Sequence, residues 1–280
     1  MADDTALVVG VADWHTNSMT GLNPLSLRRE LESRHVAGKV GRELWRRWLE
    51  FWRIIEAQKA EHGATVYAFA NGDLGDINKH SSVQLITNNE VDILDAMAEV
   101  AEPMAAVADY VFIVRGTEAH TGGNGRLEEW LARDLDNAVR YSESVASWWV
   151  ANAKIAGLRF MVTHHPPTSS RVPWTLDPAA ARAANYIFAR YAADDLLREK
   201  PDICMWAHAH TRGAQGKGMG NTWGIFLPPW QLTTSFGHRI GAGIGPRKIG
   251  GLWMLVKDSE VLDWDWERWR MRSDKPWTAP

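Results

Sequence analysis

The chain has 280 residues, of which 45% are hydrophobic and 23% charged, so it can bury one large core. Its formal net charge of -3 argues against a general nucleic-acid-binding protein, which would carry a basic excess to neutralise phosphates. No apolar run approaches the ~20 residues that span a bilayer, which argues against a membrane partner.

Five short apolar runs are predicted to be β-strands. Several are rich in β-branched or aromatic residues, and all are short for a helix. A hairpin is expected before the fourth run, because residues 148–155 form a similar segment that ends at Ala156-Gly157. The five runs are residues 6–11, 64–70, 110–114, 158–162 and 203–207.

Segments with helical periodicity separate these runs. Leu44, Trp48 and Phe51 fall at helical spacings among charged residues, which predicts an amphipathic helix. A later helix contains Pro103, where we expect it to bend or end. Strands that alternate with helices indicate an α/β fold. Helices are predicted within residues 25–62, 88–108, 126–135 and 177–198.

After His210 the chain becomes rich in glycine, with strand-like segments at 224–227 and 252–256. No internal repeat or interdomain linker is evident. We therefore expect a single domain over residues 1–280, in which residues 211–280 complete a second sheet and its loops.

The only cysteine, Cys204, excludes an intramolecular disulfide and fits a reducing compartment. Residues 1–10 lack the basic start and long apolar stretch of a secretory signal. The sequence therefore predicts a cytoplasmic protein.

Aspartate and histidine residues cluster directly after four of the predicted strands. Each cluster alone is more often structural, since an Asp at a strand end commonly caps a helix or forms a turn. Four such clusters together favour a shared site, because the carboxyl ends of strands converge at one edge of an open α/β sheet. The clusters are Asp13-x-His15, Asp73-x-x-Asp76, His164-His165 and His208-x-His210, all within residues 13–210.

Imidazole and carboxylate ligands together suit Mn, Fe or Zn better than Ca or Mg. About seven ligands are too many for one catalytic ion with open positions, so the pattern indicates two divalent metal ions. Two ions ~3.5–4 Å apart can activate a water and clamp the attacking and leaving oxygens of a phosphoryl displacement. The predicted chemistry is hydrolysis of a phosphate ester.

As an ordered set, these clusters and the segment from Gly116 to His120 resemble the calcineurin-like metallophosphoesterases over roughly residues 8–210, and most closely the members carried by phages and prophages. The resemblance implies a four-layer α-β-β-α sandwich. It also implies that Asp73 bridges the ions and that Asp76 supports the ligands. By the same resemblance, Asp13, His15 and His210 hold one ion, while His164 and His208 hold the second.

The third motif departs from the family pattern, in which Gly-Asn-His supplies an Asn ligand and a catalytic His. Thr117 occupies the Asn position, Glu118 occupies the His position, and a histidine follows only at His120. Three arrangements are open: Thr117 is a weak ligand and His120 the general acid, Glu118 ligates directly, or His120 is itself a ligand. We favour the first, because Thr117 directly follows Gly116 as the Asn would.

In the resulting mechanism a metal-activated hydroxide attacks phosphorus while His120 donates a proton to the departing oxygen. His80 follows the second motif and is a candidate contact for the substrate phosphate, although a solvated loop is the commoner role for such a residue.

The resemblance favours phosphodiesters, either a nucleotide or a nucleic-acid backbone, ahead of phosphomonoesters. Two rivals are a catalytically impaired interaction scaffold of the same fold, which the altered third motif favours, and a single-metal hydrolase. The oligomeric state does not follow from the sequence.

Overall fold

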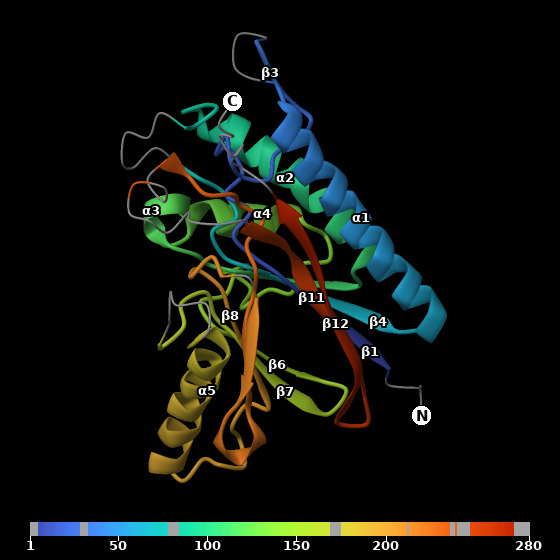
Figure 1. Ribbon diagram of the computed structural model, residues 1–280, viewed down its shortest axis with the longest axis vertical. Helices are drawn as coiled ribbons and strands as arrows, with labels where there is room; N and C mark the ends of the chain where they lie inside the picture. The colour runs from blue at the N-terminus through green and yellow to red at the C-terminus, as the bar shows by residue number, and fades with distance from the viewer. Residues whose placement is uncertain are drawn as a thin grey trace, which may run out of the picture.

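A computed structural model describes residues 5–28, 33–77, 84–168, 175–211, 213–235, 239 and 247–271. Two five-stranded sheets pack face to face, with helices on both outer sides (Figure 1). The first sheet has the order β12-β11-β1-β4-β5 and the second the order β6-β7-β8-β10-β9. The fold is an α/β sandwich of four layers, as expected.

The first sheet contains β1 (Ala6–Val11), β4 (Thr65–Asn71), β5 (Tyr110–Val114), β11 (Arg247–Lys257) and β12 (Glu260–Met271). The second contains β6 (Ala151–Ile155), β7 (Leu158–Val162), β8 (Ile203–Trp206), β9 (Ala214–Lys217) and β10 (Trp223–Phe226). A separate antiparallel pair is formed by β2 (Ser26–Arg28) and β3 (Arg34–Val36).

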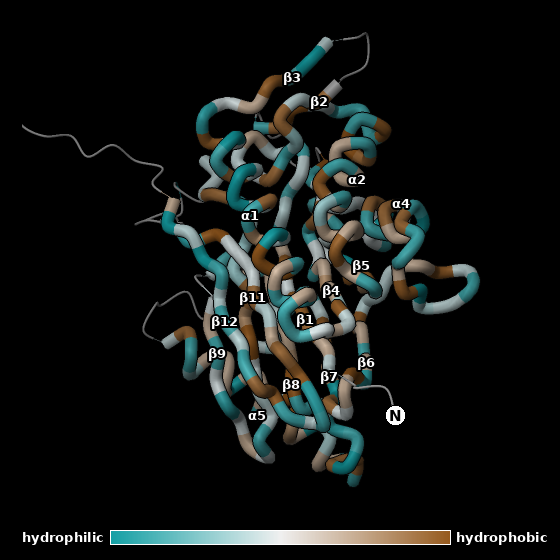
Figure 2. Tube along the Cα trace, turned by 90° about the vertical axis from the view of Figure 1, so that its right-hand side faces the viewer, coloured by the Kyte–Doolittle hydropathy of each residue, from teal (hydrophilic) through white to brown (hydrophobic). Residues whose placement is uncertain are grey.

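The helices are α1 (Lys39–His62), α2 (Glu90–Val107), α3 (Glu118–Thr121), α4 (Arg126–Asp134) and α5 (Leu176–Ala193), with a 3-10 turn η3 (Met219–Asn221). In the outer layers α1 and α2 lie on the first sheet and α5 on the second (Figures 1 and 2). No helix among these described residues is long and apolar enough to cross a membrane.

Alternation of side chains along the strands explains why both faces of each sheet are covered. In β1, Leu7 and Val9 pack under the helices, whereas Val8 points into the core between the sheets. In β8, Met205 faces the same inter-sheet core and Cys204 faces α5. Successive side chains of a strand point to opposite faces, so a strand that is buried on both faces needs apolar residues at every position.

The sequence predicted that this helix bends or ends at Pro103. In the structure α2 continues past Pro103 to Val107, so it does not end there. Proline removes one helical hydrogen bond, which weakens a helix but does not end it when packing holds the next turn. Val100, Ala101 and Met104 around the proline are all buried in the core beneath α2.

The C-terminal region divides between the sheets, which corrects the expectation that residues 211–280 complete the second sheet. β9 and β10 do so, but β11 and β12 extend the first sheet, where β11 pairs antiparallel with β1. The reason lies in β11, because Leu255 packs under α1 while Met254 enters the inter-sheet core. Such a strand needs cover on both faces, and its place beside β1 supplies it.

The strand directions bring the predicted clusters to one edge. β1, β4 and β5 run parallel in the first sheet, and β7, β8 and β10 run parallel in the second. The loops that follow β1, β4, β5, β7 and β8 therefore meet where the two sheets open toward each other, and these loops carry every predicted ligand.

Candidate metal centre

The loops at this edge hold the predicted ligands in a backbone conformation that is rare for residues other than glycine. A left-handed φ at such residues costs on the order of 1–3 kcal/mol and persists where the surrounding structure enforces it, often at functional sites. Five predicted ligands share it: Asp13 (φ 52°), His15 (45°), Asp73 (50°), His208 (65°) and His210 (46°).

Backbone hydrogen bonds lock the loop after β1 onto the loop after β4. Asp13 N donates to Gly72 O at 3.0 Å, and His15 N donates to Asp73 O at 2.9 Å. His208 N donates to Asp13 Oδ2 at 3.3 Å, which ties in the loop after β8. Hydrogen bonds within the protein therefore hold these strained turns together without a bound ligand.

Two glycines allow these loops to approach each other. A Cβ on Gly72, whose φ is +74°, would overlap the His164 ring, and a Cβ on Gly116 would overlap the backbone N and side-chain Oδ1 of Asp73. Both positions therefore require glycine, one for conformation and space and the other for space alone.

Asp13, His15 and His210 form the first group that can hold a metal ion, with one ligand atom of each within 4.8 Å of the others. His210 Nε2 lies 3.2 Å from His15 Nε2 and 3.4 Å from Asp13 Oδ1. Asp13 and His15 are buried and His210 is partly exposed, so the group opens to solvent on the side of the β8 loop.

Asp73 lies between this group and a second one. Its Oδ2 is 3.9 Å from His15 Nε2, 3.1 Å from His164 Nε2 and 3.9 Å from His208 Nδ1. His164 is buried, whereas the His208 side chain is 46% exposed and therefore sits at the mouth of the site. One carboxylate oxygen thus faces ligand nitrogens from both sides.

The chemistry of these donors fits metal ions. Among the described residues, Asp13 Oδ1 and His164 Nε2 are buried without a hydrogen-bond partner outside the site. Within the site, His210 Nε2 lies 3.4 Å from Asp13 Oδ1 and Asp73 Oδ2 lies 3.1 Å from His164 Nε2. The other ring nitrogen, His164 Nδ1, lies 2.8 Å from Asn71 O and donates to it, so Nε2 is the nitrogen that faces the site and can bind a metal ion.

Without a metal, protonated histidine supplies the positive charge in the centre. Burial opposes protonation of His164, but the Asp73 carboxylate beside it raises the His164 pKa to about 9. Burial would raise the pKa of Asp73, yet the neighbouring His164 holds it well below the ordinary value. Asp73 is thus a buried acidic ligand that stays ionised, which suits it to binding cations.

The three residues considered for the altered third motif lie in different places around the two groups. Thr117 N donates to Asp73 Oδ1 at 2.5 Å, and Thr117 Oγ1 lies 3.2 Å from Asp73 Oδ2 and 3.3 Å from His208 Nδ1. Glu118 is exposed, and its Oε1 accepts a hydrogen bond from Asn124 N at 3.1 Å. Thr117 therefore faces the second group, while the carboxylate of Glu118 is turned to its own loop.

His120 lies beside the first group. Its Nδ1 is 3.1 Å from Asp76 Oδ1, and its ring meets the His15 ring edge to face with centroids 4.6 Å apart. His15, Asp76 and His120 also lie within ligand distance of one another. Burial lowers the pKa of His120, but the Asp76 hydrogen bond and the negative charges of the nearby aspartates together raise that pKa above the ordinary value.

Two residues of this region are not among the predicted ligands and catalytic groups. Glu128 of α4 is fully buried, and its Oε1 accepts from Gly116 N at 3.3 Å and from Leu74 N at 3.4 Å. The sequence signal was present, since an acidic residue one turn before Leu131 falls on the apolar face of the helix. The other residue is His165. The predicted substrate contact His80 lies outside the described residues.

The sequence matches no protein-family model and no curated protein. Among solved structures, a 5'-nucleotidase precursor from Thermus thermophilus aligns with 95% of this chain and 54% of its own at 14% identity and a TM-score of 0.42. A novel archaeal phosphodiesterase aligns with 95% of this chain and 99% of its own at 10% identity and a TM-score of 0.40. Vps29 of Chaetomium thermophilum aligns with 96% of this chain and 91% of its own at 11% identity and a TM-score of 0.43. The chain spans about half the length of the nucleotidase precursor. All three alignments have low sequence identity and TM-scores below 0.5.

Proposed function

We propose that this chain is a dinuclear metal-dependent phosphoesterase that prefers phosphodiesters. The observation that carries the proposal is the position of Asp73 Oδ2, 3.9 Å from His15 Nε2 on one side and 3.1 Å from His164 Nε2 on the other. A carboxylate shared by two groups of ligands is the arrangement that a pair of ions requires.

In this proposal Asp13, His15 and His210 hold the first ion, and His164, His208 and Thr117 the second. Mn²⁺, Fe and Zn²⁺ suit such nitrogen and oxygen ligands. When bound, the ions supply Lewis-acid activation of a water and charge compensation for the phosphoryl oxygens.

The protein residues position the reaction. Asp76 lies 3.6 Å from His15 Nδ1 and 3.1 Å from His120 Nδ1, so one carboxylate orients both rings. His120 is 33% exposed, which leaves its ring accessible from the solvent side of the centre. We assign it the delivery of a proton to the departing oxygen, a role worth ~10²–10⁴-fold in rate.

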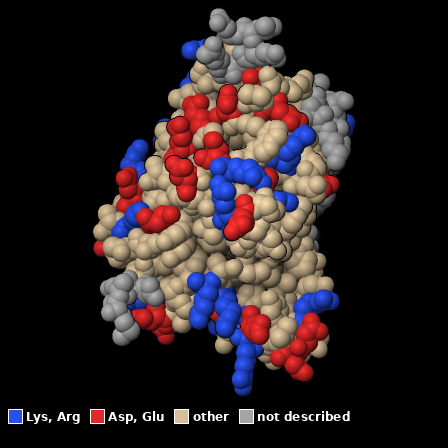
Figure 3. Space-filling model, turned by 180° about the vertical axis from the view of Figure 1, so that it is seen from behind, with Lys and Arg blue, Asp and Glu red and all other residues tan. Residues whose placement is uncertain are grey.

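The charge distribution supports a diester ahead of a monoester. A monoester carries more negative charge and would favour an extra cationic side chain at the site. Arg115, beside the third motif, is instead directed to Ser147 Oγ at 2.7 Å and Glu129 Oε2 at 3.1 Å. The face seen in Figure 3 carries both acidic and basic side chains over the described residues and shows no continuous basic surface of the kind that binds a long duplex.

The proposal is tested by hydrolysis of bis(p-nitrophenyl) phosphate and p-nitrophenyl phosphate after Mn²⁺ loading, with Asp73→Asn as control. We expect turnover of the diester to exceed that of the monoester and to disappear in the control. Faster monoester turnover would identify a phosphomonoesterase. No turnover of either ester with metal bound would leave the interaction scaffold, and one bound ion per chain with full activity would indicate a single-metal hydrolase.

A further inference from the structure

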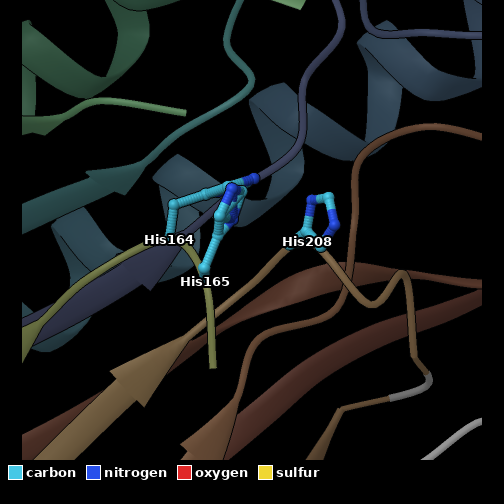
Figure 4. A group of neighbouring side chains, drawn as sticks. All are labelled: His164, His165 and His208. Carbon is cyan, nitrogen blue, oxygen red and sulfur yellow. The ribbon is translucent and has the colours of Figure 1, made fainter. Parts of the chain in front are cut away.

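His165 places a third imidazole beside the second group. Its side chain is exposed, and its ring centroid lies 4.4 Å from that of His208 and 4.9 Å from that of His164. One nitrogen from each of the three rings lies within 4.8 Å of the others (Figure 4). Rings from the loops after β7 and β8 therefore meet around one point at the mouth of the site.

The backbone restrains His165 in this place. It is followed by Pro166, which confines the preceding residue to extended conformations. His164, on its other side, is anchored by the contact of its Nδ1 with Asn71 O. The backbone at His165 therefore loses little further freedom when a ligand binds, and only rotation of its side chain must be fixed.

The second group needs a further strong donor. The first has Asp13, His15 and His210 in addition to Asp73, whereas the second, as predicted from the sequence, has the imidazoles of His164 and His208 beside Asp73. Thr117 contributes a neutral hydroxyl, which is a weaker ligand for Mn²⁺, Fe or Zn²⁺ than an imidazole nitrogen. Its oxygen is also within hydrogen-bond distance of Asp73 Oδ2 at 3.2 Å.

We propose that His165 is a ligand of the second ion and supplies the strong donor that Thr117 does not. His164, His165 and His208 then hold this ion together with Asp73, which matches the four donors of the first group. This inference rests on the proposed dinuclear function, because it assigns a ligand within that site.

The test measures metal binding in three variants of the full chain. Metal-free wild type, His165→Ala, Thr117→Val and the control His62→Ala are titrated with Co²⁺, while bound metal is counted by elemental analysis and the visible cobalt bands report the ligands. His62 is an exposed histidine at the end of α1, so its variant corrects for adventitious binding to surface histidines. Because His165 is exposed, its truncation should leave the thermal unfolding of the metal-free protein unchanged.

We expect the wild type and the control to bind two ions per chain. In His165→Ala the first ion should bind as before, while the second binds at least about tenfold more weakly and its cobalt bands change. In Thr117→Val the second ion should lose less affinity than in His165→Ala, since the ligand that is removed is the weaker one.

Unchanged affinity and cobalt bands in His165→Ala would overturn the inference, and a rise in the KM for the diester alone would then identify His165 as a substrate contact. Loss of the second ion in Thr117→Val, with His165→Ala intact, would overturn it in favour of the threonine. If either of these two outcomes is found while the wild type binds two ions and hydrolyses the diester, the inference fails but the proposed function stands. Fewer than two ions in the wild type would reject the inference and the dinuclear function together.

Discussion

Asp73 Oδ2 lies 3.1 Å from His164 Nε2, although the two residues follow strands of different sheets. Both side chains are buried. Bringing two charges out of water is costly unless they are well compensated. Their position between the two ligand groups gives this buried pair a functional reason.

Metal binding should stabilise the protein through Asp73. At a free Mn²⁺ concentration about 100-fold above the dissociation constant, binding to the native state adds about 2.7 kcal/mol, which raises the Tm by about 5–10 °C for a chain of this size. Chelation should reverse the shift. In Asp73→Asn the shift should be absent, and thermal unfolding with and without Mn²⁺ measures it. The exposed Asp136→Asn serves as the control; an equal shift in Asp73→Asn would show that Asp73 is not a ligand.

His120→Ala should lower kcat for the diester by about 10²–10⁴-fold while the protein retains two ions, because the ring contributes a proton and no metal bond. The loss should be smaller for esters with good leaving groups, which need less help from an acid. Steady-state kinetics over a series of leaving groups, beside elemental analysis, checks this. Loss of one ion in the variant would show instead that His120 is a ligand.

Gly116→Ala should be destabilising by about 1–3 kcal/mol and should weaken metal binding, because the added methyl overlaps Asp73 N and Oδ1. Gly123→Ala is the matched control: it lies a few residues along the same region, and an added Cβ there meets nothing within 4 Å. Denaturant unfolding and Mn²⁺ titration of both variants provide the measurement. Equal behaviour of the two variants would contradict the close approach of the two loops.

Glu128→Gln should change the pH dependence of stability in the metal-free protein. Burial, reinforced by the negative charge of Asp73, raises the pKa of Glu128 from 4.5 to about 7. Between these values the native state retains a proton that the unfolded chain has lost, so the stability of the wild type falls as pH rises through this window. The variant lacks this loss, which amounts to on the order of 3 kcal/mol.

The measurement is the difference in unfolding free energy between wild type and Glu128→Gln from pH 4 to pH 8, with a chelator present. The variant should gain relative stability as pH rises and keep it above pH 7. A constant difference across the range would show that Glu128 ionises normally in the folded protein.

The sequence by itself was sufficient for the five apolar strands, because their runs are local and have faces that any sheet must bury, but not for β2, β3 or β9. The runs at residues 6–11, 110–114 and 158–162 coincide with β1, β5 and β7. The clusters after the strands were visible for the same reason: Asp13 and His15, or His208 and His210, lie within three residues of each other.

Only the tertiary structure decided which strands pair and which side chains meet. The place of β11 beside β1 depends on the burial of both its faces, one under the helices and one in the inter-sheet core, and no local sequence pattern specifies this. The position of Asp73 between both groups, the convergence of His165 on His208, and the burial of Glu128 beneath Gly116 are likewise contacts between distant segments. Sequence spacing determines the face on which a side chain lies, but packing of the whole chain determines what it faces.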